Sequence, residues 1–368
     1  MKTTELPFPT SVTLTQNNQA RMTINLNTAD TLLYIDSLLP NQSYKFTATA
    51  TKNNQQLTTN EVLATTLDTT SHNFTWQTFT FGQHSSSVLY DVAIINENNI
   101  WAVGEIYMND SLGQPDPIAY NAVHWDGSEW KVKKIDVHFR GSLITPPLEG
   151  VFAFSSTDIW FVGSLPIHGD GTNWVMYDLR TTVDPNLSLS KAWGTSSSNI
   201  YFVGRNGSIA HYQNGIWKKI ESGTTSIIND IWGIVTENNE AIAYCPVSSF
   251  WIPGDKKLLS IKGNSVDSIP WTFNRLLYSV WTPSERVIYI CGGGIFERRN
   301  NQWKEINITS VAVNRVRGNY LNDIFVAGDF GFVAHFNGLT WKIEEYDFNS
   351  GFGGLSVMEN LTAVVGQR

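Results

Sequence analysis

The sequence predicts an all-β protein: a seven-bladed β-propeller over residues 71–368, preceded by a small β domain at residues 1–70. Three observations support this fold class. A short apolar pattern recurs along the chain, and a tight turn followed by a tryptophan accompanies most copies. The composition is rich in aromatic residues (12%) and poor in charged ones (16%), a balance that favours strands and turns over helices.

The recurring pattern is an Asp or Asn, an aliphatic residue, an aromatic residue and, three positions later, a glycine, as in NIWAVG and DIWFVG. With weaker copies the set numbers seven, and its last residues are Gly104, Gly163, Gly204, Cys245, Gly292, Gly328 and Gly366. Most steps are about 40 residues, the length of one four-stranded blade. We expect each copy to be the second strand of a blade, and the apolar runs before the copies to be the innermost strands.

The second pattern is a hairpin turn, most often Asp-Gly or Asn-Gly, followed by a tryptophan that opens the outer strand. A large flat side chain at the same site of every blade fills the wedge between facing sheets. We therefore assign the repeated tryptophans to packing rather than to a sugar platform: Trp101, Trp160, Trp193, Trp217, Trp232, Trp281, Trp303 and Trp341.

Ring closure is expected to involve both ends of the propeller sequence. Residues 73–82 (NFTWQTFTFG) have the pattern of an outer strand, with Trp76 in the place that Trp217 takes in its own blade. The last segment supplies only the first two strands of the seventh blade, so an N-terminal strand would complete it and remove open sheet edges. The third strand of that blade is missing, and we expect the natural protein to continue for about 15 to 25 residues.

The first domain begins with a predicted hairpin over residues 11–26, two alternating runs around an Asn-Asn turn. The spacing of Leu38, Pro40 and Tyr44, followed by an alternating strand, resembles the last strands of a fibronectin type III domain. That resemblance implies a β-sandwich-like fragment in which Tyr44 is the tyrosine-corner residue, its hydroxyl bonded to the backbone upstream. The first strands of such a domain are absent.

The propeller repeat as a whole resembles that of bacterial surface propellers, [DN]-[IV]-[WYF]-x-V-G followed by [DN]-G-x-x-W, which are grouped with BNR or photosystem-assembly repeats and with two-component-regulator propellers. A fibronectin-like piece before such a propeller is similar to secreted multidomain proteins of Bacteroidota and Ignavibacteria. The resemblance implies a secreted or cell-surface location. Its motif is structural, so it implies no catalytic residue.

Charge and composition exclude several classes of partner. The formal net charge is -8 and no basic stripe is present, which argues against nucleic-acid binding. No apolar run is long enough to span a membrane. The first ten residues lack the apolar segment of a signal peptide, so the chain is either cytoplasmic or a mature or trimmed fragment. Cys245 and Cys291 are expected to be buried free thiols, with a disulfide between them as the alternative.

The candidate ligand site lies in long insertions of the first two blades, residues 105–120 and 136–150, with a shorter one at 165–171. Long loops on a rigid scaffold often carry function, although polar insertions are also tolerated as surface length. The insertions are expected to bring together on one side of the ring Tyr107, Asp110, Asp116, His138, Arg140, His168 and Asp170. No cofactor or metal site is predicted; a structural calcium ion on the three aspartates is the weaker option.

Histidines also recur at matching third-strand positions, His124, His211 and His335, and this recurrence indicates blade packing rather than catalysis. The leading functional hypothesis is a non-catalytic binding or adhesion module, a monomer that uses a propeller face to bind a protein or glycan. The alternative is a carbohydrate-active enzyme, a glycoside hydrolase or lyase, whose carboxylates would come from Asp110, Asp116 and Asp170. A scaffold or assembly factor that uses the propeller rim is the third reading.

Overall fold

The computed structural model describes residues 6–31, 33–84, 86–250, 255–346 and 351–367. These residues are mostly in strands, with one four-residue helix among them, α1 (Leu179–Thr182). Contacts divide the chain into two compact units, Met1–Asn73 with Asn337–Thr340, and Phe74–Phe336 with Trp341–Arg368. None of the helical residues that the structure describes forms a segment long and apolar enough to cross a membrane.

The N-terminal unit is a single five-stranded antiparallel sheet within its described residues, rather than two packed sheets. Its strands are β1 (Thr10–Gln16), β2 (Gln19–Leu26), β3 (Ser43–Lys52), β4 (Gln55–Thr58) and β5 (Val62–Thr65). The predicted hairpin is confirmed, and its two turn residues, Asn17 and Asn18, have positive φ angles of 52° and 64°. The Leu39 N–H donates to the Tyr44 hydroxyl oxygen at 2.9 Å, so the expected bond to the upstream backbone is also present.

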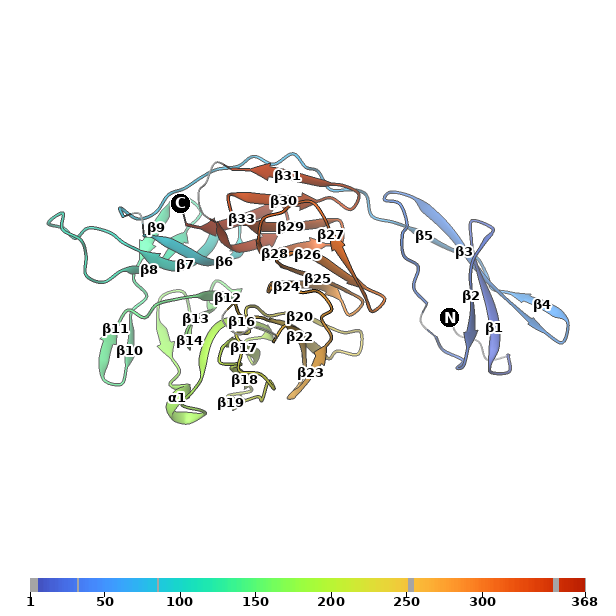
Figure 1. The fold of residues 1–368 in the computed structure, drawn as a ribbon, viewed down its shortest axis with the longest axis horizontal. Helices are drawn as coiled ribbons and strands as arrows, with labels where there is room; N and C mark the ends of the chain where they lie inside the picture. Colours follow the sequence, from blue (N-terminus) through green and yellow to red (C-terminus); the bar gives the residue numbers. More distant parts are fainter. Residues whose placement is uncertain (1–5, 32, 85, 251–254, 347–350, 368) are drawn as a thin grey trace. The chain divides into compact units, whose positions relative to one another are not determined.

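The second unit is a β-propeller of seven sheets, of which six have four strands in chain order, with the first strand on the inside of the ring (Figure 1). Blades 1 to 3 contain β6 (Val88–Asn96), β7 (Asn99–Ile106), β8 (Tyr120–Trp125), β9 (Trp130–Lys133); β12 (Gly150–Ser155), β13 (Asp158–Gly163), β14 (Leu165–Gly169), β15 (Trp174–Met176); and β16 (Ser188–Ser196), β17 (Asn199–Arg205), β18 (Ile209–Gln213), β19 (Ile216–Lys219).

Blades 4 to 6 contain β20 (Trp232–Val235), β21 (Ala241–Val247), β22 (Lys257–Lys262), β23 (Ser265–Ile269); β24 (Leu277–Ser284), β25 (Val287–Gly292), β26 (Gly294–Arg299), β27 (Gln302–Ile306); and β28 (Val313–Tyr320), β29 (Asp323–Gly328), β30 (Phe332–Phe336), β31 (Trp341–Glu345). Blade 7 contains β32 (Phe352–Met358) and β33 (Leu361–Gly366). All seven copies of the first sequence pattern are second strands, so the predicted fold class is confirmed.

The glycine that ends most repeats is required by a close backbone approach. In blades 1, 3, 5, 6 and 7 the first strand carries a register shift opposite this glycine, which marks a β-bulge. A Cβ atom on Gly104 would overlap the Val88 carbonyl oxygen, and one on Gly204 would overlap that of Ser188. The bulge pushes the first strand into the space that a side chain would fill, so the repeat ends in glycine.

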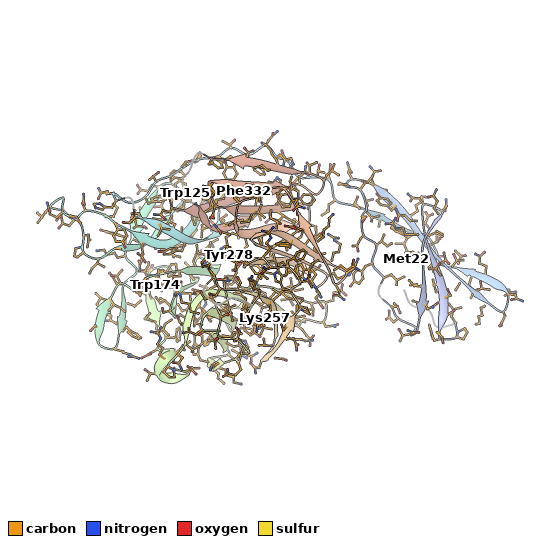
Figure 2. All side chains as sticks on the ribbon, viewed as in Figure 1. Met22, Trp125, Trp174, Lys257, Tyr278 and Phe332 are labelled. Carbon is orange, nitrogen blue, oxygen red and sulfur yellow. The ribbon has the colours of Figure 1, made fainter. Side chains whose placement is uncertain are left out.

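Apolar clusters between neighbouring blades form the core, as the repeat spacing predicts. Of the repeated tryptophans, Trp101, Trp160 and Trp281 are almost fully buried. Figure 2 shows how densely side chains fill the space between sheets. The tryptophans of the outer strands are half-buried against the same clusters, as Trp217 is against Trp160 and Phe202. Cys245 and Cys291 are buried free thiols on second strands, and burial raises the pKa of both.

Residues 74–82, which we call the strap, differ from the expected closing strand. They form no strand and pair with no sheet, because blade 7 has no third strand among the described residues to which an outer strand could bond. The strap runs along the outside of β31 toward β9 (Figure 1).

Alternate apolar side chains hold the strap in place. Phe74 packs edge-on against Phe325 of blade 6 at 5.2 Å between ring centroids, in a cluster that includes Trp76 and Leu355 of blade 7. Phe79 and Phe81 contact Trp130 of blade 1 at 5.8 and 5.4 Å. The strap therefore closes the ring by side-chain packing across the two-stranded blade.

Candidate binding surfaces

The two sides of the propeller carry different connections. The turns between second and third strands, and the links between blades, lie on one side, which we call the connection face. The turns between first and second strands, and between third and fourth strands, lie on the other side, the turn face. This alternation follows from antiparallel strands in chain order, and it determines where each candidate residue lies.

The first insertion, between β7 and β8, lies on the connection face. Within it Asp110 accepts from the backbone N–H groups of Leu112 and Gln114, at 2.8 and 2.9 Å, and so caps its own turn. Asp116 forms an ion pair with Lys134 at 2.7 Å, and this hydrogen bond lowers the pKa of the carboxyl group. The Tyr107 hydroxyl donates to Glu105 at 2.8 Å, and its pKa is raised by that bond.

The second insertion, between blades 1 and 2, forms a hairpin of β10 (Val137–Phe139) and β11 (Ser142–Ile144) on the same face. Arg140, at its tip, donates two hydrogen bonds to the Asp178 carboxylate, at 2.7 and 3.0 Å, and one to the Thr181 hydroxyl. Asp178 also caps α1. His138 lies on the exposed side of the hairpin. The partner of Arg140 was not among the predicted site residues.

His168 and Asp170 lie elsewhere than the sequence led us to expect. Residues 165–169 are the third strand β14, because Gly163 and Leu165 pair around a turn of one residue, Ser164. There is thus no insertion at this point. Asp170 caps the next turn, which lies on the turn face, and the backbone N–H of Asn173 lowers the pKa of its carboxyl group to about 2.

His168 belongs instead to an arrangement repeated in four blades. In each, an imidazole on the third strand stacks on an aromatic ring of the second strand and donates from Nε2 to the Asn or Asp that begins that strand. In blade 2 the ring centroids of His168 and Trp160 are 4.2 Å apart, and Nε2 lies 2.9 Å from Asp158 Oδ1. The other three sets are His124 with Trp101 and Asn99, His211 with Tyr201 and Asn199, and His335 with Phe325 and Asp323.

The repetition gives the Asp or Asn and the aromatic residue of the sequence pattern a structural role. The hydrogen bond fixes the imidazole over the ring and joins the start of the second strand to the third strand. Burial lowers the pKa of His124 and His211, which favours the neutral imidazole in the folded protein. The expected packing role of the recurring histidines therefore extends to His168.

No hydrogen bond or ion pair joins any two of the seven predicted site residues, all of which the structure describes, and the three aspartates are bound by different local groups. Among the described residues there is no group of three His, Cys, Asp or Glu side chains arranged to hold a metal ion. On the connection face of blades 1 and 2, the charged side chains of the loops are thus bound by neighbouring protein groups, and His138 is exposed among them.

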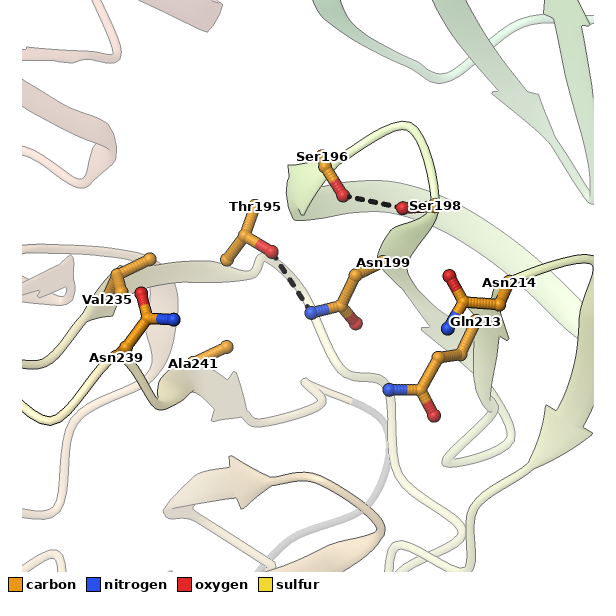
Figure 3. A pocket seen from close by; sticks show the side chains of 9 residues that line it. All are labelled: Thr195, Ser196, Ser198, Asn199, Gln213, Asn214, Val235, Asn239 and Ala241. Atoms are coloured by element: carbon orange, nitrogen blue, oxygen red, sulfur yellow. Dashed lines mark hydrogen bonds between the residues drawn. The ribbon is translucent and has the colours of Figure 1, made fainter.

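A cleft that sequence reasoning missed lies on the turn face between blades 3 and 4, with a volume of about 430 Å³ (Figure 3). Its lining comes from three turns and consists of Thr195, Ser196, Ser198, Asn199, Gln213, Asn214, Val235, Asn239 and Ala241. None of these residues is ionisable. We call it the blade 3–4 cleft.

Several polar groups of the cleft are already engaged. The Asn199 amide donates to the Thr195 hydroxyl at 3.0 Å, and the hydroxyls of Ser196 and Ser198 are 3.0 Å apart. The exposed carboxamides of Gln213, Asn214 and Asn239 have no hydrogen bond to any described residue, so each offers a donor and an acceptor to a ligand. The lining residues belong to different repeats. In the sequence, only their positions in turns could have pointed to the cleft.

Comparisons with known proteins identify the fold. No family model matches the sequence, and no curated protein matches it. Among solved structures, the chain is similar to YCF48 bound to D1 peptide, with a TM-score of 0.55 at 16% identity over 77% of this chain and 90% of that one. It is also similar to the WD40 β-propeller domain of Doa1, with a TM-score of 0.57 at 10% identity over 78% and 92% of the two chains.

YCF48 from Cyanidioschyzon merolae gives a TM-score of 0.52 at 16% identity over 77% of this chain and 94% of that chain. At these identities the likenesses establish the fold, a β-propeller of the WD40 and YCF48 kind. They do not bear on the BNR or fibronectin type III resemblances, which stay predictions.

Proposed function

We propose that this protein is a non-catalytic interaction module that binds a peptide segment of a partner protein in the blade 3–4 cleft. The observation that carries the proposal is the chemistry of the lining: three free carboxamides, several hydroxyls and no ionisable side chain. A carboxamide can donate to a peptide C=O and accept from a peptide N–H. Without an acid, a base or an activated nucleophile, the same lining supports binding and offers no group for acid–base catalysis.

The similarity to other propellers supports a role in binding proteins. The YCF48 structure contains a D1 peptide, which is a property of that protein and here supports only the class of ligand. The carbohydrate-active alternative needs a pair of carboxylates that flank a scissile bond. Asp110, Asp116 and Asp170 are each bound by local groups, and Asp170 lies on the opposite face from the other two.

Two finer parts of the proposal rest on the resemblance of the repeat to surface propellers. These are that the protein is secreted or displayed on a cell surface, and that the binding serves adhesion. The loops of blades 1 and 2, with Tyr107 and the exposed His138, are a second candidate surface for a protein or glycan ligand. A monomeric state is part of the same proposal.

The test is selection of binding peptides from a displayed random library on the immobilised full chain, with a glycan array run in parallel. We expect selected peptides to bind the wild-type protein in titration calorimetry. The double substitution Gln213→Ala and Asn239→Ala should weaken them about tenfold or more, because each lost hydrogen bond is worth roughly 0.5–1.5 kcal/mol.

The matched control is Gln302→Ala, which removes an exposed carboxamide of β27 outside the cleft and should leave the affinity unchanged. Peptides that bind the double variant as tightly as the wild type would place the site elsewhere. Binding of glycans with no binding of peptides would overturn the proposed class of ligand.

A further inference from the structure

The first strands of the seven blades place one residue each at the same level of the central channel. In blades 1, 3, 5, 6 and 7 this residue follows the bulge and lies opposite the residue before the repeated glycine, as Asp91 lies opposite Val103 and Arg315 opposite Ala327. Around the ring the level consists of Asp91, Gly150, Lys191, Ser279, Arg315 and Gly354, and Asp230, two residues before β20, joins it by accepting a hydrogen bond from the Ser279 hydroxyl. We call it the channel layer.

Two ion pairs satisfy most of the charges in the channel layer. Lys191 Nζ donates to Asp91 Oδ2 at 2.7 Å and to the Glu149 carbonyl oxygen at 2.8 Å. Arg317, two residues beyond the layer, donates one hydrogen bond to each oxygen of Asp230, both at 3.0 Å. Each carboxylate in the layer is therefore bound to a cation that is also buried.

Among the residues that the structure describes, Arg315 has no carboxylate partner. Its side chain is buried, with 8% of the residue exposed, and its Nε–H is buried without an acceptor. Its one hydrogen bond to a described residue runs from Nη1 to the Asn314 carbonyl oxygen at 3.3 Å. Two nearby acidic side chains in the sequence of the blades are engaged: Glu149, before β12, by Arg205 at 2.8 Å, and Asp329, after β29, by the Asn314 amide at 2.8 Å.

The channel thus contains three buried cations, Lys191, Arg315 and Arg317, and two carboxylates, Asp91 and Asp230. A buried charge without a counter-charge or acceptors is costly, and such a group in a native protein calls for an unseen partner. Burial, and next the positive charge of Arg315, lower the pKa of Lys191 to about 8 in spite of Asp91. The charge of Arg315 therefore acts on both Lys191 and Asp230, whose carboxylate is already bound by Arg317.

We propose that the central channel binds a small monovalent anion, a halide or a short carboxylate, at the Arg315 guanidinium. The anion accepts from the Nη groups of the guanidinium, because Nε itself has no accessible surface, and it balances the excess positive charge. A small ion is required because Arg315 is mostly buried, and its neighbour in the layer, Gly354, adds no side chain that would compete for the guanidinium. This inference does not depend on the proposed peptide site, which lies on the turn face.

The experiment is urea unfolding of the full chain in sodium chloride, sodium formate and sodium gluconate at matched ionic strength. Chloride and formate fit the site, and gluconate is too large. An anion that binds only the folded state raises the folding equilibrium constant tenfold when its concentration is about nine times its dissociation constant. We expect this rise with chloride, formate or both, and none with gluconate.

The decisive variant is Arg315→Met, which keeps the length of the side chain and removes its charge. It should lose the anion response, and in gluconate it should be more stable than the wild type, because no unpaired charge is buried. Arg275→Met is the matched control, since Arg275 is exposed and lies outside the channel layer, and it should keep the response.

A response that is equal in Arg315→Met and in the wild type, or absent from the wild type, would overturn the proposal. Line broadening of the ³⁵Cl resonance by the wild-type protein, and its reversal by bromide, tests the site without any variant. If the wild-type protein produces no broadening that bromide reverses, and its stability does not respond to formate, the proposal is also overturned.

Discussion

At the scale of single residues, each conserved position of the repeat pattern within this chain makes a defined contact within its blade. The Asp or Asn binds an imidazole, the aromatic residue stacks on it, and the glycine admits the bulge of the first strand. Each of these contacts depends on one side chain, or on the absence of one. Their consequences can therefore be tested by single substitutions.

Replacing the repeated glycine should be costly. In Gly204→Ala the new Cβ would overlap the Ser188 carbonyl oxygen and lie 2.7 Å from the Leu189 Cα. Backbone on both sides cannot move far, so we expect a loss of about 3 kcal/mol in the free energy of unfolding, measured by urea denaturation. The control is Gly353→Ala, where the nearest atom is 3.7 Å away and little change is expected. Equal effects of the two substitutions would contradict the steric explanation.

The stacked histidines predict a dependence of stability on pH. Because burial lowers the pKa of His124 and His211 below 6.5 in the folded state, the unfolded chain binds protons first as the pH falls. Their contribution is fully present above pH 6.5 and is lost as the pH falls toward the folded pKa values. Urea unfolding at pH 7.5 and 5.5 should show a smaller loss in the double variant His124→Gln and His211→Gln than in the wild type. The variant His138→Gln, at an exposed site, should behave as the wild type does.

At the scale of elements, side-chain packing attaches the strap to the blades without any pairing of strands. The strap places Phe74 and Trp76 against blades 6 and 7, and Phe81 against blade 1. Its backbone from residue 74 to 82 makes no hydrogen bond to the backbone of another described residue. The strap itself is therefore held by apolar contacts, while blades 7 and 1 are also joined by the Val88–Gln367 bridge and by the hydrogen bond from the Ile94 N–H to the Ser356 hydroxyl.

Truncation of the strap should weaken the propeller measurably. Trp76 is half-buried, so Trp76→Ala should cost about 2–3 kcal/mol in the free energy of unfolding, less than a fully buried tryptophan. Gln77→Ala, one residue along and exposed, is the matched control and should cost less than about 0.5 kcal/mol. A loss in the control as large as that in Trp76→Ala would show that the strap backbone, rather than its side chains, closes the ring.

Strands could be predicted from the sequence where a local pattern fixes both period and register. The repeated hairpin turns and the glycine at the bulge supply such patterns in blades 1, 3, 5 and 6. The strap has the same alternation, Phe74, Trp76 and then Phe79 and Phe81, but alternation reports which side chains are buried and says nothing about a partner strand. The one-residue turn at Ser164 was missed, because residues 165–171 were predicted to be an insertion rather than a third strand.

At the scale of the whole molecule, the two units have separate cores. The N-terminal core consists of Val12, Leu14, Leu26, Ala48 and Ala50, while every other apolar cluster lies within residues 74–366. Side chains buried within one unit depend on that unit's own strands. This separation predicts that each unit unfolds on its own.

Deletion of residues 1–70 tests that separation. The melting temperature of the remaining propeller should shift by less than about 3 °C, the change that roughly 1 kcal/mol produces in a domain of this size. Differential scanning calorimetry of the full chain and of the shortened chain gives the measurement. A large fall in the melting temperature would mean that the propeller draws stability from the first unit.

The proposed sites could not be predicted from the sequence, because each combines residues from different repeats. The blade 3–4 cleft joins Gln213 of one repeat to Asn239 of the next, and the channel layer joins Arg315 to residues of six other blades. A repeat reveals what its copies share, whereas these sites depend on what differs between copies at one position. The predicted loop residues were chosen for insertion length, which locates loops without showing which groups their side chains bind.

The four imidazole stacks give each of four blades its own spectroscopic signature. A proton held about 4 Å from the centre of an aromatic ring experiences that ring's current, so the carbon-bound imidazole protons of His124, His168, His211 and His335 should resonate upfield of their usual positions. Each signal would return to its usual position when its blade opens. One proton spectrum, recorded along a temperature or denaturant series, would then report the order in which the blades come apart.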